Sequence, residues 1–365
     1  MNRLSNLFLF VISFFVSIFL ADFLIGKILN VPSHWPIVRT NAAFFPSKSL
    51  KPNLDTTLHG AYHEFSFHLR TDAQGFRISS EPSDCRGLDI LFLGDSQTLG
   101  IGVNDDFTLP SLVAKRMNVC VLNAACHGYS NVEELFLAKR LLAERKPSVA
   151  VLCFFTGNDP YENLNDERYL GGETEGKVGA PSALHRAKQF LVERSAMYNL
   201  LKRLRKYKPV NAALRSMGVV EEVPPGELLV FNEAEKNLSL KEWKIIEDVL
   251  KKMNLAAQET HTKLVVLLIP DRLQVEASYW NQWVEKYKLD PTIYDRQLPN
   301  KKLAEICQTM NVPFFDSTAA LLASYKKGEK PYWQLDSHLS GRGNEVLSEA
   351  FSSYLLALLT STDKN

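Results

Sequence analysis

The sequence predicts an α/β protein, a three-layer α/β/α sandwich around a mainly parallel, five-stranded sheet like that of flavodoxin. From Asp89 onward, short apolar runs alternate with longer helical segments, the pattern of a parallel sheet that is buried on both faces. Polar turns follow these runs, as at Gly94, and ligands bind beyond the carboxyl ends of strands in open α/β sheets. The 365 residues, 45% hydrophobic and 23% charged, have room for one large domain and additional segments.

The main domain is expected over residues 87–360, and its elements can be placed in order. The expected strands are Asp89–Leu93, Val119–Leu122, Val149–Phe155, Leu264–Ile269 and Val312–Phe315. The expected helices are about Thr108–Arg116, Asn131–Glu144, Leu240–Glu259, Asn300–Met310 and Gly343–Leu359. Asp106 or Thr108 is a suitable N-cap for the first helix. Proline closes the second helix, before Pro147, and the fourth strand, at Pro270.

An insertion is expected between the third and fourth strands, over about residues 160–237, where the alternation of strand and helix breaks down. Within it, Ala183–Lys208 has the pattern of a basic helix with an interleaved apolar stripe. Two interpretations stay open. The basic face contacts anionic lipid or glycan, or it is a solvated face of an ordinary helix, which is the more common origin of such a pattern.

Residues 31–86, called here the N-terminal extension, are rich in proline, histidine and polar side chains. They are expected to form an ordered extension that packs on the main domain. The alternation of Phe65, Phe67 and Leu69 predicts one exposed-edge strand, and Asp72–Gly75 predicts a turn.

Residues 1–30 are expected to be an uncleaved signal anchor, which is a single transmembrane helix. The almost wholly apolar run Leu7–Ile25 approaches the roughly 20 residues that cross a hydrocarbon core. A cleaved signal peptide is the alternative, but the small-x-small cleavage pattern is missing at Phe19–Ala21. A buried core helix fits less well, because nothing polar gives the run a second face. Arg3 favours an N-terminus inside and a folded part outside the cytoplasm, while Lys27 weakens this orientation.

The charge and the cysteine spacing give no indication of a nucleic-acid partner or of a bound metal ion. The formal net charge of +1 gives no overall field that points to nucleic acid. The five cysteines show no metal-ligand spacing, so no metal site is expected. Their odd number leaves at least one thiol free, and one disulfide is compatible with the sequence, which cannot assign its pairing. The cysteines are Cys85, Cys120, Cys126, Cys153 and Cys307.

The residue after the first strand and its turn, Ser96, is the candidate nucleophile. A hydroxyl that leaves a buried strand on the tight turn of Gly94 and Asp95 is well placed for chemistry. The alternative is that Ser96 only caps the next helix. An ester-cleaving serine needs a base, a group that orients the base, and donors for the oxyanion.

The sequence offers candidates for each of these roles. Before the last helix, His338 can serve as the base and Asp336 as its partner. After the second strand, Gly128 can bring its N–H close to a ligand, and after the third strand Asn158 can donate its amide. Each signal is weak alone, because Gly128 and Asn158 are more often turn residues and His338 a helix-start residue. Their joint occurrence, in this order, is a strong signal.

From about Asp89 to Leu358 the chain resembles the SGNH or GDSL hydrolase superfamily. The similar segments are Gly94–Thr98 for the first block, Asn123–Ser130 for the second, Gly157–Asp159 for the third and Asp336–His338 for the last. The resemblance implies a triad of Ser96, His338 and Asp336. It also implies an oxyanion hole formed by the N–H groups of Ser96 and Gly128 and the amide of Asn158. The upstream segment Asp72–Arg77 is similar to an element that often precedes this domain in membrane-anchored members.

Two features depart from the family's pattern. The third block usually has glycine two residues before the asparagine, where this chain has Thr156. The last block usually spaces its aspartate and histidine three apart, which would need aspartate at Leu335, whereas Asp336 and His338 are two apart. Some anchored and glycan-modifying branches have this shorter spacing. A backbone carbonyl is therefore an alternative partner for His338.

The resemblance implies a serine ester hydrolase that acts through an acyl-enzyme on O-acyl esters, above all O-acetyl esters, of a cell-envelope carbohydrate. Two alternatives stay open: an O-acetyltransferase that uses the same site on an envelope polysaccharide, and a non-catalytic glycan-binding or assembly protein. The expected partners are a small-molecule or glycan ester, the membrane and envelope polysaccharide machinery, with the catalytic domain periplasmic or otherwise extracytoplasmic. Asp95, Tyr161 and Arg272 are candidate substrate contacts. Neither a metal nor an organic cofactor is required.

Overall fold

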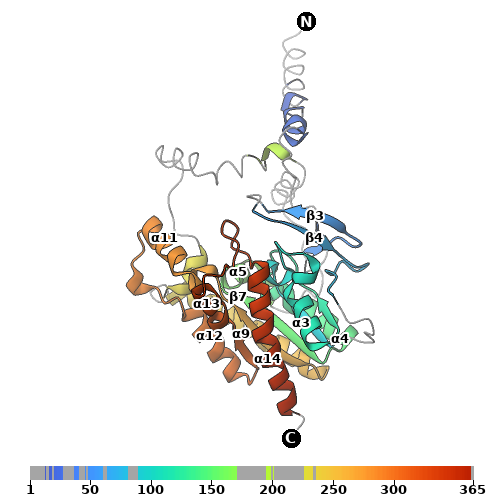
Figure 1. Ribbon diagram of the computed structural model, residues 1–365, viewed down its shortest axis with the longest axis vertical. Helices are drawn as coiled ribbons and strands as arrows, with labels where there is room; N and C mark the ends of the chain where they lie inside the picture. Colours follow the sequence, from blue (N-terminus) through green and yellow to red (C-terminus); the bar gives the residue numbers. More distant parts are fainter. Residues whose placement is uncertain are drawn as a thin grey trace. The chain divides into compact units, whose positions relative to one another are not determined.

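The chain divides into two units, residues 1–38 with 178–223 and residues 39–177 with 224–365. The second unit holds the sheet and the predicted site (Figure 1). The computed structural model describes residues 13, 16–18, 20–27, 37–40, 46, 48–60, 64–80, 89–170, 195–198, 200, 226–232 and 236–362.

The second unit is built on a parallel sheet with the strand order β6-β5-β7-β8-β9. Its strands are β5 (Ile90–Leu93), β6 (Val121–Asn123), β7 (Val149–Phe155), β8 (Lys263–Ile269) and β9 (Phe314–Asp316). Every residue of β5 and β7 is buried, which is why both appear in the sequence as unbroken apolar runs. The predicted five-stranded parallel sheet is confirmed, with small differences at the strand ends.

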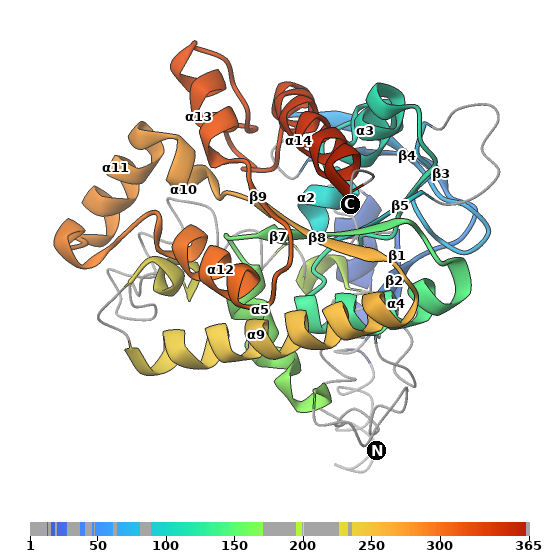
Figure 2. The ribbon, with the colours of Figure 1, turned by 90° about the horizontal axis from the view of Figure 1, so that it is seen from below.

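Helices cover both faces of the sheet, which gives the unit three layers (Figure 2). On one face lie α3 (Leu109–Met117), α13 (Thr318–Lys326) and α14 (Gly341–Thr362). On the other lie α4 (Asn131–Arg145), α9 (Lys236–Glu259) and α12 (Leu298–Thr309). The ring centroids of Phe92 and Phe351 lie 6.5 Å apart between the sheet and α14. Those of Phe154 and Trp243 lie 6.3 Å apart between the sheet and α9.

Side-chain caps fix the start of the long helices. Thr108 accepts a hydrogen bond from the Ser111 N–H and caps α3, in agreement with the sequence prediction. Ser130 and Glu133 form a reciprocal capping box at the start of α4. The sequence did not predict helix α13 or the shorter elements, which are α2 (Ser96–Leu99), α5 (Asp159–Asp166), α10 (Arg272–Val275), α11 (Ala277–Tyr287) and the 3₁₀ turns η1 (Asp105–Phe107), η2 (Glu167–Tyr169), η3 (Gly226–Phe231) and η4 (Pro291–Ile293).

The described part of the N-terminal extension contains two strand pairs. These are β1 (Val38–Thr40) with β2 (Lys48–Leu50), and β3 (Asp55–His59) with β4 (Ser66–Arg70), the second pair being antiparallel. The sequence predicted one exposed-edge strand, but Phe67 and Leu69 of β4 are buried and the strand has a partner. The partner escaped prediction because β3 is mostly polar. A bridge between Arg77 and Asn123 places the end of the extension against β6.

The first unit is described only in part. Within it, Asp22 Oδ1 accepts hydrogen bonds from the Ser195 hydroxyl at 2.8 Å and from the Met197 N–H at 2.7 Å. The predicted anchor run, Leu7–Ile25, lies partly outside the described residues, and the predicted basic helix, Ala183–Lys208, lies mostly outside them. No helix in the described ranges is long and apolar enough to cross a membrane.

The described cysteines differ in state. Cys120 takes part in a disulfide bond, the one such bond that the sequence allowed for. Cys126, Cys153 and Cys307 are free and buried. Burial raises the pKa of Cys126 and of Cys307 to about 12, so neither thiol supplies a thiolate nucleophile near neutral pH.

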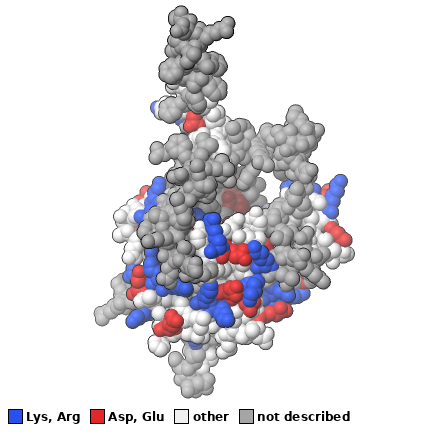
Figure 3. All heavy atoms as spheres, turned by 180° about the vertical axis from the view of Figure 1, so that it is seen from behind, with Lys and Arg blue, Asp and Glu red and all other residues white. Residues whose placement is uncertain are grey.

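Charged side chains of both signs are interspersed on the face shown in Figure 3. On helix α9, for example, Lys244 lies 3.4 Å from Glu247 and 3.5 Å from Asp248. This mixing agrees with the formal net charge of +1.

Candidate active site

Strand β5 leads directly into the candidate nucleophile. The chain turns at Gly94, where a Cβ would lie 2.3 Å from the hydroxyl oxygen of Thr98, so glycine is required. Asp95 then caps helix α2 by accepting a hydrogen bond from the Gln97 N–H at 2.9 Å. Ser96 is the first residue of that helix and not its cap. The alternative in which Ser96 serves only as a helix cap is therefore wrong.

The last predicted block meets this serine. His338 Nε2 lies 2.9 Å from Ser96 Oγ, within hydrogen-bonding distance. The other ring nitrogen of His338, Nδ1, is hydrogen-bonded to Asp336 Oδ1. The side chains are largely shielded from solvent, with 17% of His338 and 15% of Asp336 exposed. A carboxyl group, an imidazole and a hydroxyl thus form one hydrogen-bonded chain.

The residue between Asp336 and His338 explains how a two-residue spacing brings them together. Ser337 has φ of 69°, the left-handed conformation that is uncommon for residues other than glycine. This residue bends the loop, and the side chains on either side of it meet. The loop is closed by the Trp333 N–H, which donates to the His338 carbonyl at 2.9 Å. The partner of His338 Nδ1 is therefore the carboxyl group of Asp336 and not a backbone carbonyl.

Arg272, a predicted substrate contact, lies against the His338 loop. Only 6% of the residue is exposed. Its guanidinium donates to the Gln334 carbonyl at 2.6 Å and to the Gln334 side chain at 2.7 Å, and its Nε donates to Glu276 at 2.8 Å. In this structure the guanidinium is therefore occupied by protein groups that hold the loop.

The second predicted block is tied to the nucleophile turn. Gly128 has φ of 69°, a conformation that favours glycine. The Cys126 N–H donates to the Gly94 carbonyl at 3.1 Å, which joins the loop before Gly128 to the turn before Ser96. The Gly128 carbonyl accepts a hydrogen bond from Lys48 Nζ.

The third predicted block lies at the carboxyl end of β7. The side chain of Asn158 acts on the carboxyl group of Asp95, next to the candidate nucleophile: burial raises the pKa of Asp95, and Asn158 opposes this shift. Thr156 stands where the family usually has glycine, and its hydroxyl joins the ends of β7 and β8. It accepts from the Asp271 N–H at 2.8 Å and donates to Gln274 Oε1 at 2.5 Å. The departure from the family's pattern thus has a structural role.

Buried carboxyl groups surround the starts of helices α4 and α5. The Asn131 amide donates to Glu134 and to Asp159, both at 2.9 Å. Burial raises the pKa of Asp95, and it raises the pKa of Glu134 and of Asp159 well above the ordinary carboxyl range. Burial therefore favours the protonated form of each carboxyl.

Because of its buried glutamates, we expect the protein to be more stable at mildly acidic than at mildly alkaline pH. Burial raises the pKa of Glu133, Glu162 and Glu242 from 4.5 to about 7. Between pH 4.5 and about pH 7 the folded protein holds protons that the unfolded chain releases. The free energy of unfolding therefore falls as the pH rises through this range. We expect thermal unfolding, followed by circular dichroism, to occur several degrees lower at pH 8 than at pH 5.

The variant Glu242→Gln provides the matched test. Its side chain can hold no extra proton, so the dependence of the unfolding temperature on pH should be shallower than in the wild type. An unfolding temperature that rises between pH 5 and pH 8 in the wild type would contradict the prediction.

The other two predicted substrate contacts lie in different surroundings. Asp95 is fully buried, where it caps helix α2. Tyr161, on helix α5, is 45% exposed and so remains accessible to a ligand. Among the described residues, no group of three or more histidine, cysteine, aspartate or glutamate side chains could hold a metal ion.

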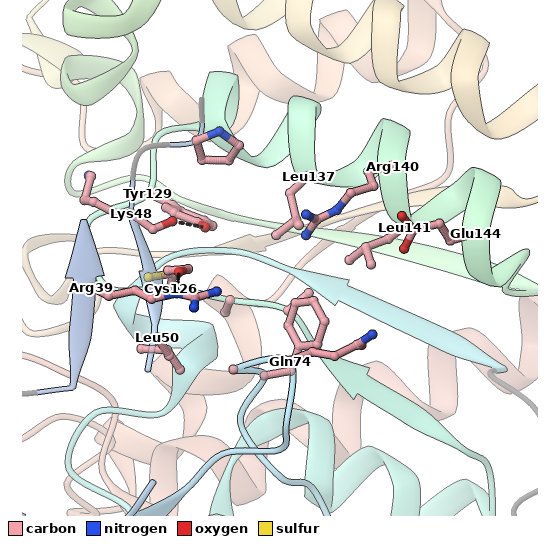
Figure 4. Close-up of a pocket in the computed structure, with 16 residues that line it drawn as sticks. Arg39, Lys48, Leu50, Gln74, Cys126, Tyr129, Leu137, Arg140, Leu141 and Glu144 are labelled. Carbon is pink, nitrogen blue, oxygen red and sulfur yellow. Dashed lines mark hydrogen bonds between the residues drawn. The ribbon is translucent and has the colours of Figure 1, made fainter. Parts of the chain in front are cut away.

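A cavity of about 650 Å³ lies between the N-terminal extension and helix α4 (Figure 4). Arg39 and Arg140 point into it from opposite sides, and Cys126 forms part of its wall (Figure 4). Neither Ser96 nor His338 lines this cavity, which borders the second block through Cys126 and Tyr129.

Three charged residues of the N-terminal extension contact the predicted site, namely Lys48, Glu64 and Arg77. Arg77 belongs to the segment Asp72–Arg77, whose resemblance to an upstream family element was a signal in the sequence. The other two gave no signal. Lys48 lies 80 positions from its partner in the second block, and Glu64 lies 271 positions from Leu335.

No family model matches the chain, and no curated protein matches its sequence. Similar solved structures include the lipase/acylhydrolase from Enterococcus faecalis, 14% identical, with a TM-score of 0.39 over 73% of this chain and 95% of that one. A psychrotrophic esterase from Pseudoalteromonas sp. is 12% identical, with a TM-score of 0.36 over 74% of this chain and 98% of that one. A two-domain esterase active on acetylated mannans is 13% identical, with a TM-score of 0.41 over 75% of this chain and 50% of that one.

At these identities and TM-scores the likeness adds no argument about the reaction. The residues themselves carry more weight. The first and last blocks of the sequence resemblance meet at the carboxyl end of β5, where His338 reaches Ser96. The second block is hydrogen-bonded to the turn at Gly94, and Asn158 of the third block acts on the carboxyl group of Asp95. The chain resembles the SGNH or GDSL hydrolases in its parallel sheet and in the side chains that meet at the carboxyl end of strand β5.

Proposed function

We propose that the protein is a serine ester hydrolase that works through an acyl-enzyme. One observation supports this above the others: the hydrogen-bonded chain from Asp336 through His338 to Ser96. A hydroxyl next to an imidazole, with a carboxyl group on the far side of the ring, is the arrangement that activates a serine for attack on a carbonyl.

In the proposed mechanism, His338 Nε2 takes the proton of the Ser96 hydroxyl as Oγ attacks the ester carbonyl. Asp336 holds Nδ1 and stabilises the imidazolium that forms. The N–H groups of Ser96 and Gly128 and the amide of Asn158 are the proposed donors to the oxyanion. The intermediate then collapses, and the imidazolium gives its proton to the departing alcohol. Water, deprotonated by His338, then attacks the acyl-serine. The bond between the acyl carbon and Ser96 Oγ breaks, the imidazolium returns its proton to Oγ, and the acid is released.

We propose O-acyl esters of a cell-envelope carbohydrate, above all O-acetyl esters, as the substrate. The predicted signal anchor over residues 1–30 supports an extracytoplasmic location, because it would hold the catalytic domain at the outer side of a membrane. The disulfide of Cys120 supports it independently, since disulfides persist mainly in oxidising compartments outside the cytoplasm.

The proposal is tested with the full-length chain and two reagents. We expect it to hydrolyse p-nitrophenyl acetate and to be labelled by a fluorophosphonate probe, with the label found on Ser96 by peptide mass spectrometry. Protein unfolded in urea serves as the control for non-specific labelling. A folded chain that neither hydrolyses the ester nor takes the label would overturn the proposal.

The acceptor is determined by a second assay on O-acetylated polysaccharide. Release of free acetate into water supports the hydrolase. Transfer of acetyl from p-nitrophenyl acetate to an unacetylated polysaccharide, at the expense of free acetate, would instead support the O-acetyltransferase.

A further inference from the structure

We infer that the N-terminal extension is part of the active site, because three of its charged side chains each hold one catalytic segment in place. This inference rests on the proposed function and adds positioning residues to it. The residues are Glu64 for the loop of the catalytic histidine, Lys48 for the loop of the oxyanion glycine, and Arg77 for the helix of the nucleophile.

Glu64 binds the backbone of the loop that carries Asp336 and His338. Its carboxylate accepts three successive N–H groups, from Gln334 at 2.5 Å, Leu335 at 2.8 Å and Asp336 at 3.3 Å. Hydrogen bonds to an ionised carboxylate are among the stronger ones in proteins.

Packing holds the base of this loop, where the ring centroids of Trp333 and Phe65 lie 5.1 Å apart, but it does not hold the tip. The side chain of Leu335 lies outward, and 62% of the residue is exposed. The tip is therefore held by polar groups on its two sides, Glu64 from the N-terminal extension and Arg272 from helix α10. The left-handed conformation of Ser337 adds strain that these contacts must offset.

Lys48 holds the second block in a similar way. Its Nζ donates to the carbonyl of Gly128 and lies 3.0 Å from Glu133 Oε2 at the start of helix α4. The backbone carbonyl of Lys48 also accepts a hydrogen bond from the Tyr129 hydroxyl at 2.7 Å (Figure 4). The extension thus contacts the peptide unit that follows Gly128 and the side chain of the next residue, Tyr129, and so restrains the loop at the proposed oxyanion donor.

Arg77 holds the helix that begins at Ser96. Its guanidinium donates to the carbonyls of Leu99 and Gly100, both at 2.7 Å, where helix α2 ends. It also donates to Asp105 at 2.9 Å. A guanidinium is well suited to this task, because its five donors have a fixed geometry.

Together these contacts explain why charged residues lie at these three points. Proposed catalytic groups must be held to within a fraction of an ångström, and a misplacement of about 1 Å can cost about 10²-fold in rate. We therefore assign Glu64 and Lys48 as positioning residues, which act through Asp336, His338 and Gly128 without touching the substrate.

The test uses Glu64→Gln and Lys48→Met in the full-length chain, with p-nitrophenyl acetate as substrate. We expect kcat to fall about ten- to a hundredfold in each variant, while KM stays within about twofold, because the positioned groups act in the transition state. Asp55→Asn and Lys51→Met are the matched controls, since within the described residues neither side chain forms a hydrogen bond or ion pair with the catalytic segments. Both controls should keep the wild-type kcat.

A second measurement is independent of activity. Hydrogen exchange at the Leu335 and Asp336 amides should be faster in Glu64→Gln than in the wild type and in Asp55→Asn, at an equal unfolding temperature. Unchanged kcat in Glu64→Gln and Lys48→Met beside an active wild type would overturn the inference and leave the proposed function standing. If the wild type is inactive, the proposed function fails, and the exchange data alone decide whether Glu64 holds the loop.

Discussion

Replacing Ser96 by alanine should lower ester turnover by about 10⁴- to 10⁶-fold, since a serine nucleophile has no substitute in an acyl-enzyme mechanism. The fold should be unaffected. Asp95, not Ser96, caps helix α2, so the lost hydroxyl leaves no backbone group of the helix unsatisfied. Steady-state kinetics with p-nitrophenyl acetate, beside circular dichroism at equal concentration, measure both expectations.

His338→Ala should cost a similar factor, and the double variant should be little worse than either single one, because the two groups act as a unit. Ser353→Ala is a suitable control, as this serine lies exposed on helix α14 and bonds only its own helix. Residual activity near the wild-type level in Ser96→Ala would place the chemistry elsewhere in the molecule.

Replacing Arg77 by methionine should cost about 3–5 kcal/mol of unfolding free energy, because it removes one partner from a buried ion pair. The Arg77 side chain is fully buried and Asp105 is 4% exposed, so the carboxylate would lose its buried cation. Four carbonyl groups would also lose a donor, those of His68, Leu99, Gly100 and Val103. Urea unfolding followed by fluorescence measures the loss.

The comparison for this prediction is Arg70→Met. Arg70 binds the same carboxylate at 2.9 Å, but 43% of its side chain is exposed, so its loss should cost no more than about 1 kcal/mol. Equal losses for Arg70→Met and Arg77→Met would show that burial of the guanidinium is not what makes the contact strong.

The sheet was predictable because its strands are buried on both faces. Strands β7 and β8 are apolar nearly throughout, and no helical or alternating pattern competes with that signal. The strand β3, with the sequence Asp-Thr-Thr-Leu-His, was not predictable, because only Leu58 within it is buried. The four-residue helices α2 and α10 are too short to show a helical period, so the capping roles of Asp95 and Asp271 could not be predicted.

The candidate site could be predicted as a set of residues but not as a geometry. The sequence blocks identified Ser96 and His338 as candidates. The two-residue spacing between Asp336 and His338 left the role of Asp336 open until the conformation of Ser337 was known. The surroundings of Arg272 could not be predicted for a related reason. Sequence places it after a strand, where ligands often bind, but cannot show that its guanidinium is used by Gln334 and Glu276.

The position of the loop that carries Asp336 and His338, near the end of the chain, determines when the protein can first become active. Ser96 and its base are 242 positions apart in the chain. At about 5–20 residues per second, roughly 10 to 50 seconds of synthesis separate the two residues. During that interval the emerging polypeptide has its serine but no imidazole to activate it. Under the proposed mechanism, a chain that is still being synthesised therefore does not hydrolyse esters inside the cell that makes it.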